Sequence, residues 1–374
     1  MGTSIVSDLQ VSLNGQPLDA QADLPVLCEV EVDIGVQQQG MVRLQLSAGQ
    51  DASGDWARTT IHKYTPGSPI SVDVRIGDTT TRLINGVLTQ TKLSLSAELH
   101  DSRVEVVGMD ALERVKRSHH AQKYQGDLST IVVQVLGRQN IPLDGGKTPS
   151  ISNLSESQTD SDLDFLTTLA RKYNCEIYVE SSSDGDTAFF QKLEFDSADL
   201  VPGASRATPA DLRINQGLQS NVQNAEFSID LSGPTRVEAN NVAANGKAAA
   251  QIIASDLRDI PTLSQLETDL LGDPSLALVS RLNREGQSTM SDLQTRCDSE
   301  LEKSSWVVIG KGELDTASYG DLLVPRRAIT VRGAGSLFEG TYMIWKVTHS
   351  FRREVHCQRF ELRRKLGMML NGGS

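Results

Sequence analysis

The chain has 374 residues, a net charge of −12 and 38 % hydrophobic residues. This length is enough for two or three domains, and the hydrophobic content is ordinary for a globular protein. The acidic balance argues against a dedicated nucleic-acid-binding protein, which normally carries a basic surface. No apolar run exceeds four residues, so the sequence predicts no membrane-spanning helix. The cysteines are far apart in the sequence and are predicted to be reduced thiols (Cys28, Cys175, Cys297 and Cys357).

The first 110 residues alternate apolar and polar side chains in short runs, which is typical of half-buried strands. Turn signals such as Asn14-Gly15 and Pro66-Gly67 separate these runs. The spacing predicts a barrel or sandwich with one polar face, built from strands at 28–34, 42–46, 70–76, 84–88 and 103–107. On the first of them, Glu29, Glu31 and Asp33 share the polar side. That acidic side suits either the inner wall of a wide channel or ordinary solvent exposure.

Residues 111 to about 205 change character. Apolar residues recur at helical spacing over 127–136, so we expect an amphipathic helix that ends at Gly137. A second helix is predicted to begin at Thr159–Asp162, where Thr and Asp three residues apart can cap free amide groups. A strand at 175–179, a turn at Asp184–Asp186 and a strand at 189–193 are expected to follow.

From about residue 206 the pattern returns to strands. They are predicted at 212–214, 225–231, 306–309, 322–324 and 329–331. Residues 240–303 interrupt them with Ala- and Leu-rich sequence for which we expect helices, one of them over 290–303.

The end of the chain predicts an antiparallel hairpin of two alternating strands, 340–351 and 356–363. On the first strand, one face is expected to carry Met343, Trp345, Val347 and Phe351. On the second, Gln358, Phe360 and Leu362 share a face, opposite Arg359, Glu361 and Arg363. Trp345, Val347 and Phe360 are predicted core residues.

The sequence offers little that favours catalysis or metal binding. His119 and His120 are adjacent, so in a regular helix or strand their side chains diverge and make a poor metal pair. His349 lies in an apolar pattern and is predicted to be a hydrogen-bonded core histidine. Asp184–Asp186 lacks the later acidic ligands of a calcium loop, and no carboxylate pair is recognisable as an acid–base pair. We therefore expect no enzyme, no cofactor and no metal site.

Two segments resemble a known family. Ser161–Val179 follows the pattern of a helix with the motif Asp-x-x-Phe-Leu-x-x-Leu-Ala that feeds a strand. The closing hairpin, with Gly-x-Tyr-x-(apolar)-x-x-Val-x-His in its first strand, resembles that of tail-hub proteins. These are the late control protein D family of contractile phages and R-type pyocins, and the amino-terminal half of VgrG spikes.

The resemblance implies an α+β, mostly β fold, in which two tube-like antiparallel β-barrel domains flank a small mixed α/β domain. The boundaries would be 1–115, 116–205 and 206–370, with a helical insertion at about 240–303 in the second barrel. It also implies a homotrimer, because three copies of two barrels present six quasi-equivalent units to a hexameric tube and a threefold spike.

The implied partners are a hexameric inner tube protein, a separate spike protein with an OB-fold and needle, and baseplate wedge or LysM-type adaptor proteins. The spike is expected to be separate because the sequence stops at Leu370–Ser374, which leaves no room for an OB-fold and needle. The family assembles in the bacterial cytoplasm, into a phage tail or a related contractile injection particle. Candidate lumen-facing residues are Glu29, Glu31, Asp33, Arg359, Glu361 and Arg363. No specific nucleic-acid binding is implied.

Two alternatives of other classes stay open at this point. The chain could be a tail-associated peptidoglycan hydrolase whose site is assembled from residues scattered along the sequence. It could also be a receptor- or glycan-binding β protein of the same particle.

Overall fold

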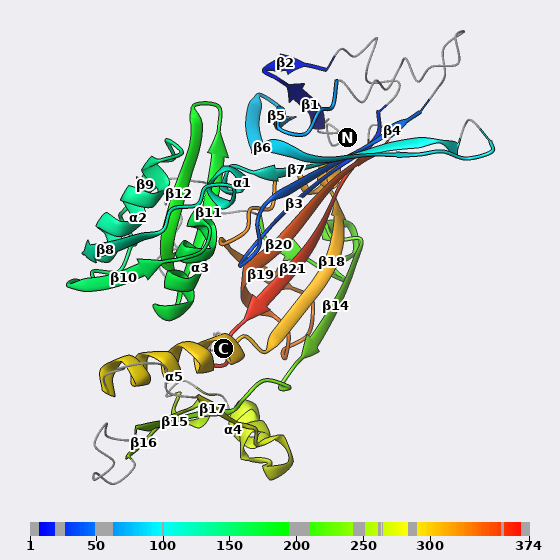
Figure 1. Cartoon of the computed structure of the whole chain (residues 1–374). Helices are drawn as coiled ribbons and strands as arrows, with labels where there is room; N and C mark the ends of the chain where they lie inside the picture. The colour runs from blue at the N-terminus through cyan, green and yellow to red at the C-terminus, as the bar shows by residue number, and fades with distance from the viewer. Residues whose placement is uncertain are drawn as a thin grey trace.

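The computed structural model describes residues 7–18, 27–48, 63–98, 101–193, 210–241, 251–260, 263, 265–282, 290–352 and 355–367. In this part of the chain, thirteen strands form one large sheet that runs through the molecule (Figure 1). Its first half consists of β1 (Ser7–Leu13), β2 (Gln16–Pro17), β3 (Leu27–Gly35), β4 (Met41–Ser47), β5 (Pro69–Ile76), β6 (Thr79–Ser94) and β7 (Arg103–Asp110). Its second half consists of β13 (Leu212–Arg213), β14 (Asn224–Ile229), β18 (Val308–Asp315), β19 (Ala328–Arg332), β20 (Gly340–Arg352) and β21 (Val355–Arg364).

The two halves meet at one pair of strands. β20, from the end of the chain, runs antiparallel to β3 from its beginning, in a register that pairs Lys346 with Gly35 and Arg352 with Glu29. The predicted closing hairpin is present as β20 and β21, and the mostly β architecture is the one that the alternating pattern predicts. The regions expected to form the two tube-like β-barrel domains are therefore hydrogen-bonded to each other through a continuous sheet.

A β-bulge changes which side chains of β20 face the core. The register between β20 and β21 shifts between Ile344 and Lys346, so Trp345 is an extra residue without a partner on β21. Beyond the bulge, the alternation is shifted by one residue. Ile344 and Val347 therefore both join the core of the second half.

Trp345 belongs to a different cluster from Val347. It is buried with Met343, Val36 and Trp306 in a small group of its own. The prediction that Met343 and Trp345 share a face with Val347 is wrong, because a bulge leaves no mark on a simple alternating pattern. Val347 and Phe360 do lie together in the core of the second half.

In the sequence, a mixed part with its own apolar core lies between the two halves of the sheet. It consists of α1 (Leu112–Lys116), β8 (Gln122–Gly126), α2 (Leu128–Gly137), β9 (Leu143–Asp144), β10 (Leu154–Gln158), α3 (Asp162–Lys172), β11 (Cys175–Ser182) and β12 (Gly185–Lys192). Both predicted helices and the predicted β11–β12 hairpin are present. The cap of α3 is Ser161 rather than Thr159, and its hydroxyl accepts from the backbone N–H of Asp164 at 3.1 Å. The same capping chemistry thus operates two residues later than predicted.

Residues 240–303 are less helical than predicted. β15 (Arg236–Asn241), β16 (Gln251–Asp256) and β17 (Val279–Leu282) form a small sheet, accompanied by α4 (Gln265–Gly272) and α5 (Met290–Ser304). The helix predicted at 290–303 is confirmed, and it lies against β15 and β16. Ala and Leu favour helices locally, but β16 and β17 pair with β15 and are therefore strands. Tertiary pairing outweighs the local preference here. The remaining short helices are η4 (Gly217–Gln219), η5 (Leu257–Asp259), η6 (Pro274–Leu276) and α6 (Thr316–Tyr319).

The strand predicted at 322–324 is instead a buried connection between α6 and β19. The backbone N–H of Leu323 donates to Oε1 of Gln358 at 2.7 Å. The Gln358 side-chain amide donates in turn to Thr316 at 3.0 Å. The Gln358 side chain thus satisfies the backbone N–H of Leu323, so residues 322–324 can be buried without pairing to a neighbouring strand.

A buried arginine connects the two halves of the sheet to the mixed part. Arg326 precedes β19, has a left-handed backbone (φ 67°), and its side chain is 7 % exposed. Its guanidinium donates to both carboxylate oxygens of Glu176 on β11, at 2.5 and 3.1 Å, and to the carbonyl of Gly35 at 2.6 Å. It also stacks over the ring of Tyr178 at 3.8 Å. One side chain therefore joins three regions that are far apart in the sequence, its own included.

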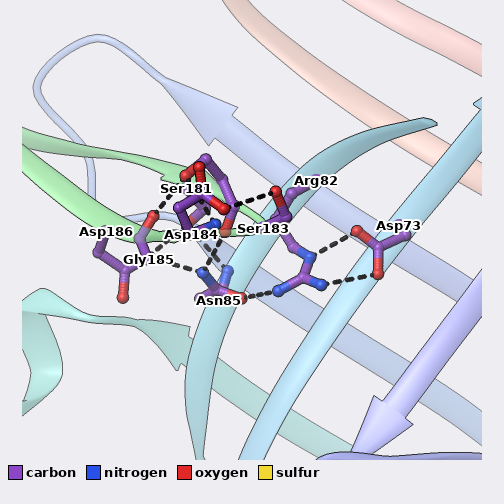
Figure 2. Close-up of polar contacts among 9 residues, drawn as sticks. Asp73, Arg82, Asn85, Ser181, Ser183, Asp184, Gly185 and Asp186 are labelled. Atoms are coloured by element: carbon purple, nitrogen blue, oxygen red, sulfur yellow. Dashed lines mark hydrogen bonds and ion pairs between the residues drawn. The ribbon is translucent and has the colours of Figure 1, made fainter. Parts of the chain in front are cut away.

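A second polar joint holds β6 against the β11–β12 hairpin (Figure 2). The backbone N–H of Asn85 donates to the Ser181 hydroxyl at 2.9 Å, and its side-chain amide donates to Asp186 at 3.1 Å. Arg82 orients Asn85 by donating to its Oδ1 at 2.5 Å, while it forms a two-point ion pair with Asp73. The orientation of the mixed part is thus fixed at both ends of β11.

We predict that Arg326→Met lowers the free energy of unfolding by about 3–5 kcal/mol, because Glu176 is left as a buried, unpaired charge. Chemical denaturation measures this change. The matched control is Arg332→Ala, which breaks the exposed pair with Asp211 and should cost less than about 1 kcal/mol. Arg326→Met/Glu176→Gln should recover part of the loss; a double variant as unstable as the single one would contradict this role for Arg326.

Candidate functional site: the charged face of the central sheet

The acidic side of β3 is one element of an extended charged face. Glu29, Glu31 and Asp33 alternate with the core residues Val30 and Val32, and their side chains are 14–19 % exposed. Carboxylates at this depth are partly removed from water and need partners to remain charged at low cost. The neighbouring strands β4, β20 and β21 supply these partners.

Glu31 lies between two arginines. Arg43 on β4 donates to one of its oxygens at 3.1 Å, and Arg359 on β21 donates to the other at 2.6 Å, across the intervening β20. Glu29 accepts from Arg352 at 2.8 Å and from the Ser350 hydroxyl at 3.3 Å. The Glu31 carboxylate therefore links the first and second halves of the sheet on the charged face. Arg326 makes a similar link elsewhere, through Gly35.

The chain of contacts continues along the same face. Asp33 pairs with Lys346 at 3.6 Å and accepts from the Thr348 hydroxyl. Arg363 pairs with Glu361 at 2.7 Å. Its guanidinium also lies 4.2 Å from the centre of the Trp345 ring, where a cation–π contact is favourable.

The structure brings the predicted acidic and basic groups onto one sheet face. The sequence-based prediction did not include the cations that pair with the carboxylates, Arg43, Lys346 and Arg352. Arg43 was recognisable in principle, because it alternates with the core residues Val42 and Leu44 on a predicted strand. Lys346 was not recognisable, because the face of β20 on which its side chain lies depends on the bulge at Trp345.

The charges of the ion-paired residues on this face balance. Five cations pair with five carboxylates, namely Arg43, Lys346, Arg352, Arg359 and Arg363 with Glu29, Glu31, Asp33, Glu105 and Glu361. The chain as a whole carries −12. This ion-paired set is thus polar yet neutral as a group, so its electric field weakens quickly with distance.

A shallow groove of about 560 Å³ crosses β14, β18, β21 and β20 on this side. Its charged lining repeats the balance, with Lys311, Lys346 and Arg359 against Glu226, Glu313 and Glu361. No group of three or more His, Cys, Asp or Glu side chains suited to a metal ion occurs in the described part of the chain. In the same residues, none of the helices is long and apolar enough to cross a membrane.

Two histidines lie buried in the closing hairpin. His349 Nδ1 and His356 Nε2 are 3.2 Å apart, and the His356 ring stacks on Phe351 with 3.9 Å between centroids. The prediction of a hydrogen-bonded core histidine at His349 is confirmed. Burial lowers the pKa of His356 to about 3. Burial, and secondarily the charge of His356, lowers the pKa of His349 well below its usual range, so both rings are neutral at pH 7.

No family model matches the sequence, and no curated protein matches it. Solved structures do. The 43 kDa tail protein of prophage MuSo2 from Shewanella oneidensis superimposes with a TM-score of 0.70 at 12 % identity, over 96 % of this chain and 98 % of that chain. A tail protein from Neisseria meningitidis MC58 gives 0.67 at 11 % identity, over 97 % and 98 %. The fold of this chain is the fold of phage tail proteins.

A chain of the Francisella PdpA-VgrG complex in its half-lidded form is similar as well, with a TM-score of 0.59 and 11 % identity. There the similarity covers 97 % of this chain but 59 % of that chain. The predicted resemblance to the tail-hub and VgrG family is thus confirmed at the level of the fold.

We predict that Glu31→Arg lowers the free energy of unfolding by about 1–3 kcal/mol, because it places three arginines together. Arg359→Glu in the same chain should restore about half of that loss, since the pair then re-forms with reversed sign. The matched control is Asp8→Arg beside Arg75, an ion pair with both side chains 60 % exposed, which should change stability by less than about 0.5 kcal/mol. Additive effects of the two substitutions, measured by denaturation, would show that Glu31 and Arg359 are not coupled.

We predict that His356 makes the fold sensitive to acid. Between about pH 3 and pH 6.5 the folded state binds fewer protons than the unfolded state, so stability falls as the pH falls. From pH 7 to pH 5 the wild type should lose about 2 kcal/mol more than His356→Phe. The wild type is compared with the variant because Asp110 also titrates in this range. Burial raises the pKa of Asp110 to about 6, so Asp110 makes the fold more stable as the pH falls. His119→Gln, at an exposed site, should behave like the wild type; equal slopes for all three proteins would refute the prediction.

Proposed function

We propose that this chain is a structural hub subunit of a phage tail or a related contractile injection machine. It would act as a trimeric adaptor that joins a hexameric inner tube to a trimeric spike. The single observation that carries the proposal is the continuous sheet, whose charged face is assembled from both halves of the chain and has its cations and carboxylates paired with each other. The fold shared with tail proteins supports it.

Open sheet edges favour self-association. In the described residues, β14 pairs only with β18 at one end of the sheet, and at the other end β1 pairs with the two-residue β2 and with β5. Unpaired edges have free backbone donors and acceptors, which neighbouring subunits would satisfy. In a closed ring of three chains, two tube-like halves per chain give the six-fold repetition that a hexameric tube requires.

The charged face would line the lumen of this ring. The wall of a channel through which cargo passes must be wetted by water and must not bind the cargo strongly. Internally paired charges meet both conditions, because each charge already has a partner and the field beyond the wall is weak. We therefore retain Glu29, Glu31, Asp33, Arg359, Glu361 and Arg363 as the proposed lumen residues.

The proposed domains are 1–115, 116–205 and 206–370, with the insertion at about 240–303. Three main apolar clusters support this division, each mostly within one segment, although Ala111, Leu112 and Val115 pack in the cluster of the middle segment. Leu322 and Phe351 from the last segment also pack in the first cluster, so the two tube-like domains would behave as one rigid unit. The proposed partners are the inner tube, a separate spike, and wedge or LysM-type proteins, after assembly in the bacterial cytoplasm.

Light scattering should give a mass of about 120 kDa, three times the 40.6 kDa chain, and the trimer should co-sediment with inner tubes. Glu31→Arg/Arg359→Glu preserves the net charge of the face and should leave both results unchanged. A mass of 40.6 kDa at all concentrations, with or without spike protein, would exclude the trimeric hub. A trimer that fails to sediment with tubes would exclude the adaptor role.

A further inference from the structure

One strand of the insertion, β17, has an unpaired outer edge. In the described residues it lies at the margin of the small sheet and pairs with β15 alone. The extended backbone begins before the strand, since Ala277 has φ −73° and ψ 105°. The small sheet lies at one end of the molecule, beyond the long sheet, so this edge is separate from the edges at β14 and β1 (Figure 1).

The outward backbone groups of this edge belong to Val279 and Arg281. The Leu278 carbonyl accepts from the N–H groups of Thr235 and Arg236, at 2.9 and 3.2 Å, so the backbone of Leu278 points toward β15. Successive residues of a strand direct their N–H and C=O groups to opposite edges. Those of Val279 and Arg281 therefore point away from β15, to a side where no described strand lies. Such an edge recognises an extended segment by adding it as a further strand.

Apolar side chains are exposed along the same edge. Leu278 is 49 % exposed and Val279 is 44 % exposed, and these neighbours are two of the six large apolar side chains that are strongly exposed in the described part of the chain. Soluble proteins often protect an edge strand with Lys or Pro, and residues 277–282 contain neither. A further strand would cover both apolar side chains.

The two faces of β17 differ. Leu282 lies beside Ala239, which is buried in the core cluster of the second half. Alternation along the strand puts Leu278 on this core face, and Val279 and Arg281 on the opposite, outer face. A segment that extends the sheet therefore needs apolar side chains on the core face and polar ones on the outer face, which is a strict alternation.

The charges on the outer face favour an acidic neighbour for Arg281. Three arginines share two carboxylates there, since Asp256 pairs with both Arg236 and Arg258. Glu238 pairs closely with Arg236, at 3.0 Å, whereas its contact with Arg281 is longer, at 3.5 Å. The Arg281 side chain stays 77 % exposed. A glutamate on an adjacent strand would supply the missing carboxylate.

We propose that the β17 edge binds an extended segment of a partner protein, in which apolar residues alternate with polar ones and an acidic residue lies beside Arg281. The backbone of the segment pairs with Val279 and Arg281, and its apolar side chains cover Leu278. A second copy of β17 fits less well, because a symmetric antiparallel pair would place two Arg281 side chains close together on one face. The inference goes beyond the proposed hub function and does not depend on it, because the whole edge lies within one chain.

The test uses a fluorescein-labelled nonapeptide in which valine alternates with glutamate and threonine, titrated with the full-length protein. Fluorescence anisotropy should show saturable binding. Val279→Pro removes an outward N–H that the pairing with β15 does not use, and should weaken binding at least tenfold, since proline is tolerated at such edge positions. Arg281→Glu should also weaken binding, at least fivefold. Thermal melting checks that both variants fold.

The matched control is Lys303→Glu on α5, the same charge change at an exposed site of the same insertion, which should alter affinity less than twofold. Two further peptides are N-methylated on alternate amides, one along each edge of the peptide. Only one edge can face β17, so one of these peptides should bind and the other should not. Should Val279→Pro melt early, this pair of peptides still decides.

The proposal is overturned if the unmethylated peptide does not bind, if both N-methylated peptides bind equally, or if Lys303→Glu weakens binding as much as Arg281→Glu. It is also overturned if the peptide does not bind and Val279→Pro has a lower mass than the wild type in light scattering, because the edge would then belong to a contact between copies of this chain.

Discussion

The relative placement of the three regions depends on the buried ion pair between Arg326 and Glu176. A guanidinium removed from water is costly unless every donor finds an acceptor, and here the acceptors belong to β11 and to the end of β3. The backbone N–H of Gln37 donates to the same carboxylate at 2.6 Å, so the acceptor is itself held from both sides. Movement of any one region would leave a charge unpaired in the interior, which explains why the arrangement is specific.

β20 connects the two halves within the sheet. Its bulge places Trp345 in the small cluster with Met343 and Trp306, while Val347 stays in the core of the second half and Phe351 reaches the core of the first half. One strand thus contributes to three apolar clusters and pairs with both β3 and β21. On its polar side, the ion pairs of Glu31 with Arg43 and Arg359 connect the strands around it. The charged face is therefore connected across β4, β3, β20 and β21.

Alternation of side chains is local information, and the elements that depend on it were predictable. β3, β5 and β21 were recognisable because each alternates strictly, and α3 because its apolar residues recur at helical spacing. The bulge at Trp345 was not, since it is defined only by pairing with β21. The β15–β16 pairing and the buried loop at Leu323 likewise depend on partners distant in the sequence. The site was predicted as two separate charged groups, and only the β3–β20 pairing shows that they share one face.

The pairing of β3 with β20 also affects how fast the chain can fold. The residues that it joins, such as Glu29 and Arg352, are 323 positions apart in the chain. At a translation rate of roughly 5–20 residues per second, β3 waits about 15–60 s on the ribosome before its neighbour is made. Contacts of such long range slow folding, and during the wait the apolar residues Val30 and Val32 border an unpaired edge. Nascent chains are therefore most vulnerable to aggregation in this interval, and a chaperone that shields the β3 edge would raise the yield of soluble protein more than one that acts on the finished chain.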